Sequence, residues 1–412
     1  MARLAVGWAL VSDALPLYPL YALLFAHAGL SDARISALFA IWSSVGLLAE
    51  VPAGALADRY SRRAALVLAG LLQGAGFAVW TVVPHFAGFA TGFVLWGLGG
   101  TLVSGAFEAM LYDGLVRRAA GSSFPVVLGR VRAAGLLAQL PAALSATVLY
   151  RLGGFALAGW ASVACCVAAA CLAAWFPSGR AAAALREARQ GADEPAADDE
   201  PDPDEPSYLA TLRVGLVEAA VQPAVRRVLV AVALLSGVDA IEEYFSLLAR
   251  DWGVPTGLVP LATVGISLAG AVGAALAGRL GRRSATALFG VAAAALAGSG
   301  LLGRQAGLAL VALFYFGYRL VLVRAEAALQ DRISGTARAT VTSVAALGTE
   351  VATFALYGAW TLGGVGLTAG LVVALALALP WLLSGRRGRS GGRRGQRAPA
   401  AQALARISDS AE

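Results

Sequence analysis

The sequence predicts an all-α membrane protein with 12 transmembrane helices in two pseudo-symmetric six-helix bundles. Three observations lead to this fold class. Hydrophobic residues make up 58% of the 412 residues and charged residues only 14%, whereas a soluble domain is about 25% charged. Apolar runs of the roughly 20 residues that cross a bilayer recur along nearly the whole chain. Signatures in the first half also return in the second half at nearly constant spacing.

The apolar runs fall into two sets of six. The first set lies near residues 4–27, 33–56, 64–84, 87–113, 123–150 and 154–176. The second set lies near residues 225–249, 256–278, 284–303, 307–329, 338–361 and 364–384. Connections within each set are short. We therefore expect an N-terminal bundle over residues 1–176 and a C-terminal bundle over residues 223–385.

The segments outside the bundles have a different composition. Residues 177–222 are acidic and rich in proline, with an Asp, Glu and Pro run over 198–206. Such a stretch cannot bury apolar surface, so we predict a disordered linker, followed by a short amphipathic helix on the membrane at 207–221. The tail, residues 386–412, is rich in arginine, glycine and serine. It is predicted to be disordered and drawn to anionic lipid headgroups, or simply to fix the topology.

The placement of arginine predicts the orientation in the membrane. All 32 basic residues are arginine, and most of them fall on the side that holds both termini and the linker. Only Arg34, Arg151, Arg250 and Arg304 fall on the other side. Because cytoplasmic loops carry the excess of basic residues, both termini are predicted to be cytoplasmic. We expect a multi-pass protein of a bacterial plasma membrane.

The composition also excludes several chemistries. There is no lysine, which excludes Schiff-base and Walker-type lysine mechanisms. Two histidines, and three cysteines close together in one apolar run, fit neither a metal site nor a disulfide framework. No nucleophile and base stand in a recognisable pattern, and a basic stripe for nucleic acid needs a soluble domain. We therefore expect a monomer that is not an enzyme, without cofactor, metal or nucleic acid.

Three signatures recur in the same order in the two halves. The matched pairs are Asp13-x4-Tyr18 with Asp239-x4-Tyr244, the loop 57–63 with the loop 277–283, and Glu108-x4-Asp113 with Glu326-x4-Asp331. Their offsets are 226, 220 and 218 residues. A duplicated six-helix unit with both copies in the same orientation is a known plan of secondary transporters, whose substrate site lies near the midplane between the halves.

The loop after the second span carries a family resemblance. Residues 54–63 read Gly-Ala-Leu-Ala-Asp-Arg-Tyr-Ser-Arg-Arg and follow Glu50-Val51-Pro52. This resembles the signature loop Gly-x-Leu-Ala-Asp-Arg-x-Gly-Arg-Arg of the major facilitator superfamily, with Ser61 in place of the second glycine. The resemblance covers residues 1–385. Two drug-antiporter patterns are missing: Arg-x-x-x-Gly in the fourth span, and a Gly-Pro-rich motif in the fifth, where residues 139–143 read Gln-Leu-Pro-Ala-Ala.

The resemblance implies the fold of that superfamily, alternating access, and a cytoplasmic gate locked by the aspartate and arginines of the loop. A carboxylate at a helix end is compatible with this role, because it can cap a neighbouring helix and pair with arginine. The alternative is that Arg62 and Arg63 only enforce the topology. The expected gate residues are Glu50, Gly54, Asp58, Arg59, Arg62, Arg63, Asp113, Arg279, Arg282, Arg283 and Asp331.

Carboxylates inside the spans are candidate site residues, because an ionisable side chain at mid-bilayer is costly. Asp13 lies in the inner half of the first span, and Asp239, Glu242 and Glu243 lie at mid-depth or beyond in the seventh. Asp239 and Glu242 share one helix face, where a carboxyl group could bind and release a proton in each cycle. We expect these four residues to act in proton coupling or cation recognition; wet or structurally paired carboxylates are the alternative.

Arginines inside the spans need carboxylate partners, because an unpaired one is untenable there. Glu108 and Arg130 lie at similar depth, and so do Arg319 and Glu350. Static ion pairs, substrate contacts, and pairs that form in only one state all remain open. Arg319 and Glu350 are counted with the proton or substrate candidates. The predicted intramembrane ion pairs involve Glu108, Arg130, Arg132, Arg324 and Glu326.

Aromatic residues on the same spans complete the candidate site. Tyr18 and Tyr244 could stack on a planar or cationic ligand, although core packing explains such residues equally well. Deep acidic residues outnumber deep basic ones, which favours proton coupling and cationic or neutral substrates. The prediction is a proton-coupled secondary transporter that exports small organic molecules. The alternatives are a proton-coupled uptake transporter and a non-transporting receptor or scaffold with the same fold.

Overall fold

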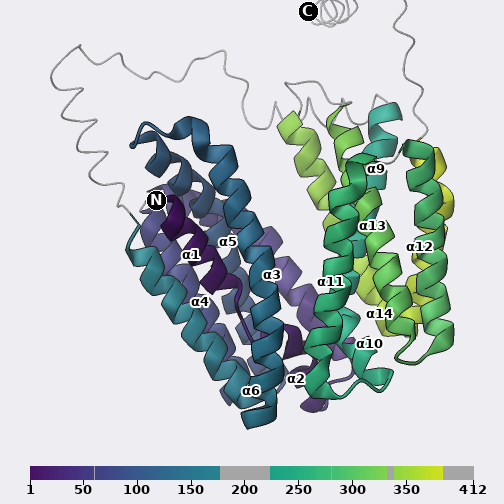
Figure 1. Ribbon diagram of the computed structural model, residues 1–412, viewed down its shortest axis with the longest axis horizontal. Helices are drawn as coiled ribbons and strands as arrows, with labels where there is room; N and C mark the ends of the chain where they lie inside the picture. Colours follow the sequence, from purple (N-terminus) through teal and green to yellow (C-terminus); the bar gives the residue numbers. More distant parts are fainter. Residues whose placement is uncertain (60, 177–222, 280, 332–337, 384–412) are drawn as a thin grey trace, which may run out of the picture.

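A computed structural model describes residues 1–59, 61–176, 223–279, 281–331 and 338–383 of the chain (Figure 1). The described residues form helices joined by short connections, and no strand occurs among them. The predicted linker with its amphipathic helix at 207–221, and the basic tail at 386–412, lie outside the described residues.

The helices follow the two predicted sets. The first half contains α1 (Ala2–Asp13), η1 (Tyr18–Leu20), α2 (Tyr21–His27), α3 (Asp32–Arg59), α4 (Arg62–Val82), α5 (Phe86–Val116), η2 (Gly121–Ser123) and α6 (Phe124–Ala174). The second half contains α9 (Pro223–Val238), η3 (Asp239–Tyr244), α10 (Phe245–Asp251), η4 (Thr256–Leu258), α11 (Val259–Leu276), η5 (Ala277–Arg279), α12 (Arg282–Leu302), α13 (Gly307–Gln330) and α14 (Arg338–Leu383).

The described helices account for the twelve predicted crossings. Nine helical segments in the described ranges are long and apolar enough to span a membrane. Two of these, Gly121–Ala174 and Val344–Leu383, hold two crossings each. The broken helix from Pro223 to Asp251 is the twelfth crossing. It is not among the nine apolar segments because it contains several charged residues. The all-α fold with twelve spans is therefore confirmed.

Glycine pairs make the two reversals inside α6 and α14. Gly154 has φ 62° and ψ −155°, and Gly364 has φ 54° and ψ −145°. Only glycine adopts this region without strain, because any side chain there meets the backbone. The preceding residues, Gly153 and Gly363, also share one conformation. The two halves thus turn between their fifth and sixth crossings in the same way.

The first crossing of each half is broken at matching positions. The break in the first half lies between α1 and α2, and the break in the second lies between α9 and α10. Both crossings end in one type of turn, because Gly29 and Gly253 each have φ +85°. In that turn Leu30 N–H donates to Phe25 O at 3.2 Å, and Val254 N–H donates to Ala249 O at 2.9 Å. The duplication predicted from the sequence is therefore present in the backbone.

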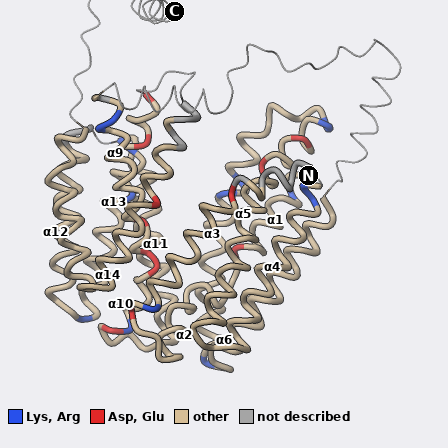
Figure 2. Tube along the Cα trace, turned by 180° about the vertical axis from the view of Figure 1, so that it is seen from behind, with Lys and Arg blue, Asp and Glu red and all other residues tan. Residues whose placement is uncertain are grey.

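The halves lie side by side and approach each other at one end (Figure 1). We call the end where α1 and α9 begin the terminal face, and the end where α2 and α10 finish the far face. Contacts between the halves join α2 to α10, α3 to α14 and α6 to α11. Toward the terminal face the helices of the two halves diverge (Figure 1). The outer helices α4 and α12 carry few charges along their length, as a surface against lipid requires (Figure 2).

The buried core follows this arrangement. One continuous apolar core joins the second half to the part of the first half nearest the far face, including Phe25, Phe39 and Trp80. A separate core around Trp8, Leu66 and Phe107 belongs to the first half alone. Among the described residues, dense apolar packing connects the halves through the first of these cores, which lies toward the far face.

Candidate functional site

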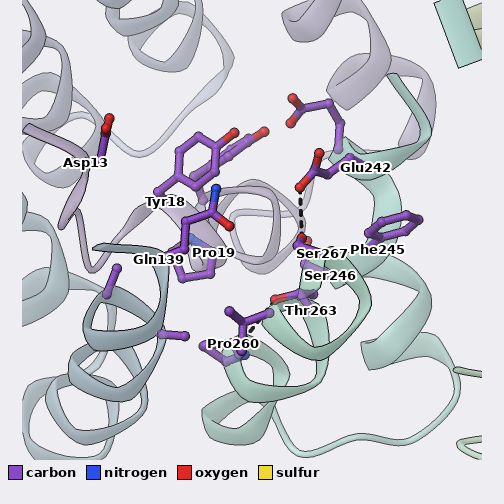
Figure 3. Close-up of a pocket in the computed structure, with 15 residues that line it drawn as sticks. Asp13, Tyr18, Pro19, Gln139, Glu242, Phe245, Ser246, Pro260, Thr263 and Ser267 are labelled. Atoms are coloured by element: carbon purple, nitrogen blue, oxygen red, sulfur yellow. Dashed lines mark hydrogen bonds between the residues drawn. The ribbon is translucent and has the colours of Figure 1, made fainter. Parts of the chain in front are cut away.

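A small cavity of about 80 Å³ lies between the two halves (Figure 3). The first half contributes Asp13, Tyr18 and Gln139, and the second contributes Glu242, Glu243 and Ser267, among others. Asp13 ends α1, and both glutamates lie in η3. The two helix breaks therefore bring carboxylates from both halves to one cavity.

The breaks have different local causes. Pro16 and Pro19 lie in the first break, where the missing proline N–H groups cannot continue an α-helix. The freed N–H of Leu17 donates to Ser162 Oγ at 2.9 Å, which satisfies a backbone group inside the protein. The second break contains no proline; the charged stretch Asp239–Tyr244 instead tightens into a 3-10 helix. Tightened turns inside longer helices often mark functional positions.

Asp239 and Glu242 belong to a satisfied polar cluster. Arg319 Nη1 lies 3.0 Å and 2.9 Å from the two carboxylate oxygens of Asp239. The hydroxyl of Tyr315 lies within hydrogen-bond distance of both acids, 3.1 Å from Asp239 Oδ1 and 2.8 Å from Glu242 Oε2. Ser267 Oγ donates to Glu242 Oε1 at 2.9 Å. The charge of Arg319 is thus neutralised by Asp239 of the seventh span, and not by Glu350 of the eleventh span.

Glu350 does not take the place beside Arg319 that its depth suggested. It lies half-buried on α14, and its Oε2 atom is buried with no hydrogen-bond partner in the described structure. It lines neither of the cavities described here. Residues on many helices lie at the same depth along the membrane normal. Pairing also requires that the two helices be neighbours and that the side chains be turned toward each other.

Asp13 and Glu243 differ from the cluster because their carboxylates are not hydrogen-bonded to any described residue. Asp13 is exposed to the cavity and sits against Gly135 of α6, where an added methyl group would strike the carboxylate. Glu243 is partly buried and lines the cavity from the other half. The site therefore holds two carboxylates that are available to an ion or a ligand.

Tyr244, the counterpart of Tyr18, is placed differently. Its side chain is fully buried, at 0% exposure. Its hydroxyl lies 2.7 Å from Ser36 Oγ in the other half, and its ring stacks on Trp360 with 4.1 Å between centroids. Tyr18 is 36% exposed and lines the cavity. One tyrosine of the repeat thus faces the cavity, and the other holds the halves together.

A larger cleft of about 660 Å³ adjoins the cavity in the first half. The two spaces share Asp13, Tyr18 and Gln139. Aromatic side chains line much of the cleft, and Trp96 has a buried Nε1 without a hydrogen-bond partner among the described residues. The aromatic lining residues besides Tyr18 are Trp8, Trp96 and Phe107.

The ion pair in this cleft joins Glu108 to Arg132, with 2.8 Å between Oε1 and Nη2. The sequence predicted Arg130 as the partner of Glu108. Residues two apart on a helix point to nearly opposite sides, so only one of these arginines can face α5. Both arginines are exposed, and the structure turns Arg132 toward α5. On α13, Arg324 is half-buried and Glu326 exposed, and neither forms an ion pair with a described residue.

Some of the expected gate residues lie together at the terminal face. Arg62 Nη1 at the start of α4 lies 2.6 Å from Asp113 Oδ2 at the end of α5, and Ser104 Oγ donates to Glu50 Oε1 at 2.8 Å. Ser61, which stands where the family motif has glycine, caps α4 by accepting from Ala64 N–H. Arg63 is half-buried, and Arg279 and Asp331 are exposed. The side chains of Asp58, Arg59, Arg282 and Arg283, and the surroundings of Gly54, lie outside the described structure.

Nothing in the sequence singled out Ser36, Ser267 or Gln139, although each touches the site or the contact between the halves. Serine and glutamine occur in many membrane spans, so their positions become informative only once helix packing is known. Within the described ranges, no group of three or more His, Cys, Asp or Glu residues could hold a metal ion.

Comparisons with known proteins agree with this fold. The family model described as Major Facilitator Superfamily matches residues 5–356. The nucleoside transporter NupG is 12% identical with a TM-score of 0.66, covering 93% of this chain and 99% of its own. The peptide transporter POT in complex with sulfate is 14% identical, with a TM-score of 0.61 over 92% and 94% of the two chains. The D-xylose-proton symporter is 15% identical, with a TM-score of 0.59 over 92% and 94%. Comparison with curated protein sequences finds no match.

Proposed function

The chain belongs to the Major Facilitator Superfamily, and the solved structures that it resembles are transporters. We propose that it is a proton-coupled secondary transporter. It works by alternating access and exports small organic molecules. One observation carries the proposal. Glu243 lies without a hydrogen-bond partner among the described residues in a cavity between the halves, beside the satisfied cluster of Asp239 and Glu242.

The coupling role of Glu243 follows from its surroundings. A carboxylate in the middle of a membrane span is costly, and a purely structural one would be paired. Asp239 has Arg319 and Glu242 has Ser267 and Tyr315, so these two are held in place. Glu243 has no such partner in the described structure, yet it lines the cavity between the halves. It is the acid best placed to gain and lose a proton during transport.

The contact between the halves supports alternating access. Ser36 and Tyr244 bridge the halves by a 2.7 Å hydrogen bond, and Phe39 packs edge-on against Tyr244 with 5.4 Å between centroids. Tyr244 directly follows Glu243 in η3. A shift of the Glu243 backbone on protonation would therefore move Tyr244 and its contact with the first half. With the terminal face on the cytoplasmic side, as the arginines predict, the contacts between α2 and α10 lie toward the outside.

Transport in proteoliposomes tests both the direction, export or uptake, and the coupling to protons. Purified protein is reconstituted with a pH-sensitive dye inside the vesicles, and a panel of small organic molecules is added under an imposed pH gradient. We expect at least one compound to move protons across the membrane. Reversing the gradient shows whether the compound and the proton move in opposite directions, as in export, or together, as in uptake.

Two variants decide the coupling assignment. Glu243→Gln removes the unpaired carboxylate, and a triple variant adds Asp239→Asn and Glu242→Gln. We expect both to stop compound-dependent proton movement, while Asp251→Asn, an exposed acid at the far face, behaves as the wild type. Proton movement that survives in the triple variant would contradict the coupling role. A folded protein that moves none of the compounds would instead favour a receptor.

A further inference from the structure

The two joined cavities have an unbalanced charge. Asp13, Glu242 and Glu243 line the inner cavity, and no described arginine lines it. Arg319, the basic side chain of the neighbouring polar cluster, is bound to both oxygens of Asp239. In the larger cleft the single lining arginine, Arg132, is paired with Glu108. The described lining therefore carries an excess of negative charge that no side chain in it neutralises.

The shape of the space separates a charged end from an apolar body. A cavity of about 80 Å³ is well below the roughly 300–1,000 Å³ of ordinary ligand sites, which suits a small charged group rather than a whole ligand. The cleft of about 660 Å³ continues from it past Tyr18 and has the volume of an ordinary ligand site. Trp8, Trp96 and Phe107 line that cleft, so its walls suit an aromatic or aliphatic body.

We propose that the substrates are organic cations with a protonated amine on an aromatic or apolar body. The amine binds in the inner cavity at Asp13 of the first half and Glu243 of the second, and the body lies in the cleft. The assignment rests on the proposed transport function, since it names the substrate class of the same cavity. It accounts for the two carboxylates that line the inner cavity without a hydrogen-bond partner among the described residues.

The other two charge classes fit the described lining poorly. An anion would enter a cavity with three carboxylates and no free arginine in its described lining, which opposes binding at short range. A neutral molecule would leave Asp13 and Glu243 desolvated without a partner. An ammonium group donates up to three hydrogen bonds, and charge-assisted bonds of this kind are the strong ones. Tyr18 adds a ring face to which a cation is attracted.

Binding of matched probes tests the charge class without relying on transport. The protein is placed in nanodiscs of phosphatidylglycerol, whose headgroup carries no amine. Calorimetry then compares phenethylamine, 2-phenylethanol and phenylacetate, which share a ring but differ in charge. Two further triples with a naphthyl and a cyclohexyl body cover the shape of the cleft. Within each triple that binds, we expect the amine to bind at least about tenfold more tightly than the alcohol and the acid with the same body.

Variants locate the binding. Asp13→Asn and Glu243→Gln should each weaken amine binding by about tenfold, whereas Asp251→Asn should leave it unchanged. Melting temperatures of the variants confirm that they are folded. Equal affinity for amine and alcohol, amine binding unaffected by both substitutions, or no amine binding at about 1 mM would overturn the proposal. Selective amine binding in a protein that moves no protons would leave the substrate class standing and refute only the coupling.

Discussion

The two halves share a backbone but use matching residues differently. Asp13 and Asp239 both mark the break in the first crossing of their half. Asp239 is bound by Arg319 and Tyr315, whereas Asp13 faces the cavity with no hydrogen-bond partner in the described structure. Tyr18 lines the cavity, while Tyr244 is buried against Ser36 and Trp360. The duplication preserved the turns and breaks, and the side chains at them diverged.

The comparison assigns different tasks to the halves. The second half holds a fixed polar cluster and the tyrosine that joins the halves, so it supplies structure around Glu243, which lines the cavity without a partner among the described residues. The first half supplies an open carboxylate and the aromatic cleft. The following predictions test this division, beginning with the largest expected effect.

Removing the arginine of the cluster should destabilise the protein most. Arg319→Ala leaves Asp239 without its cation, which costs about 2 kcal/mol in the free energy of unfolding; the full cost of breaking a buried pair is reduced because both side chains are about one-third exposed. Asp13→Ala should cost less than about 0.5 kcal/mol, since no described pair is lost. Unfolding in detergent, followed by circular dichroism, measures both. Equal losses would remove the distinction between the two aspartates.

Substitution of the glycines in the two turns should destabilise the protein equally, because both turns belong to the backbone that the halves share. Gly154→Ala and Gly364→Ala each place a side chain at positive φ, which costs about 1–2 kcal/mol. Gly366→Ala is the matched control, since its added methyl group meets nothing within 4 Å and its φ is not in the positive range. The same unfolding measurement applies. A large loss in one half with none in the other would show that the two turns are not equivalent.

The two tyrosines should separate in their effect on conformation. Tyr244→Phe removes the hydrogen bond to Ser36, worth about 1 kcal/mol. That shifts the balance between far-face-closed and far-face-open states by about fivefold. Tyr18→Phe should leave this balance unchanged, because its hydroxyl forms no bond between the halves in the described structure. Spin labels at the far-face ends of α2 and α10 report the distance distribution. An unchanged distance distribution for Tyr244→Phe would show that the hydrogen bond between Tyr244 and Ser36 does not keep the far face closed.

The smallest expected effect concerns the space beside Asp13. Gly135→Ala places a methyl group against the Asp13 carboxylate and should displace it. We expect binding of phenethylamine to weaken by about threefold, which corresponds to about 0.6 kcal/mol. Gly129→Ala, on the same helix with nothing within 4 Å, is the control. If both variants bind phenethylamine like the wild type, the position of Asp13 does not matter for cation binding.

Local patterns in the sequence determined the membrane fold of this protein. Apolar runs set the crossings, because each must bury about 20 residues in lipid whatever its neighbours are. The matched motifs Asp13-x4-Tyr18 and Asp239-x4-Tyr244 indicated the duplication, but not the helix breaks that lie at them. Even the unpredicted turns at Gly153-Gly154 and Gly363-Gly364 have a local cause in the freedom of glycine.

Tertiary structure alone decided which charges meet. Depth suggested Glu350 for Arg319 and Arg130 for Glu108, and the structure has Asp239 and Arg132 instead. A single chain reveals how deep a residue lies, but pairing also depends on which helices are neighbours and how each is rotated about its axis. The same rotation turns Tyr18 into the cavity and Tyr244 into the contact between the halves. The repeat made the two tyrosines equal in sequence, and packing made them different.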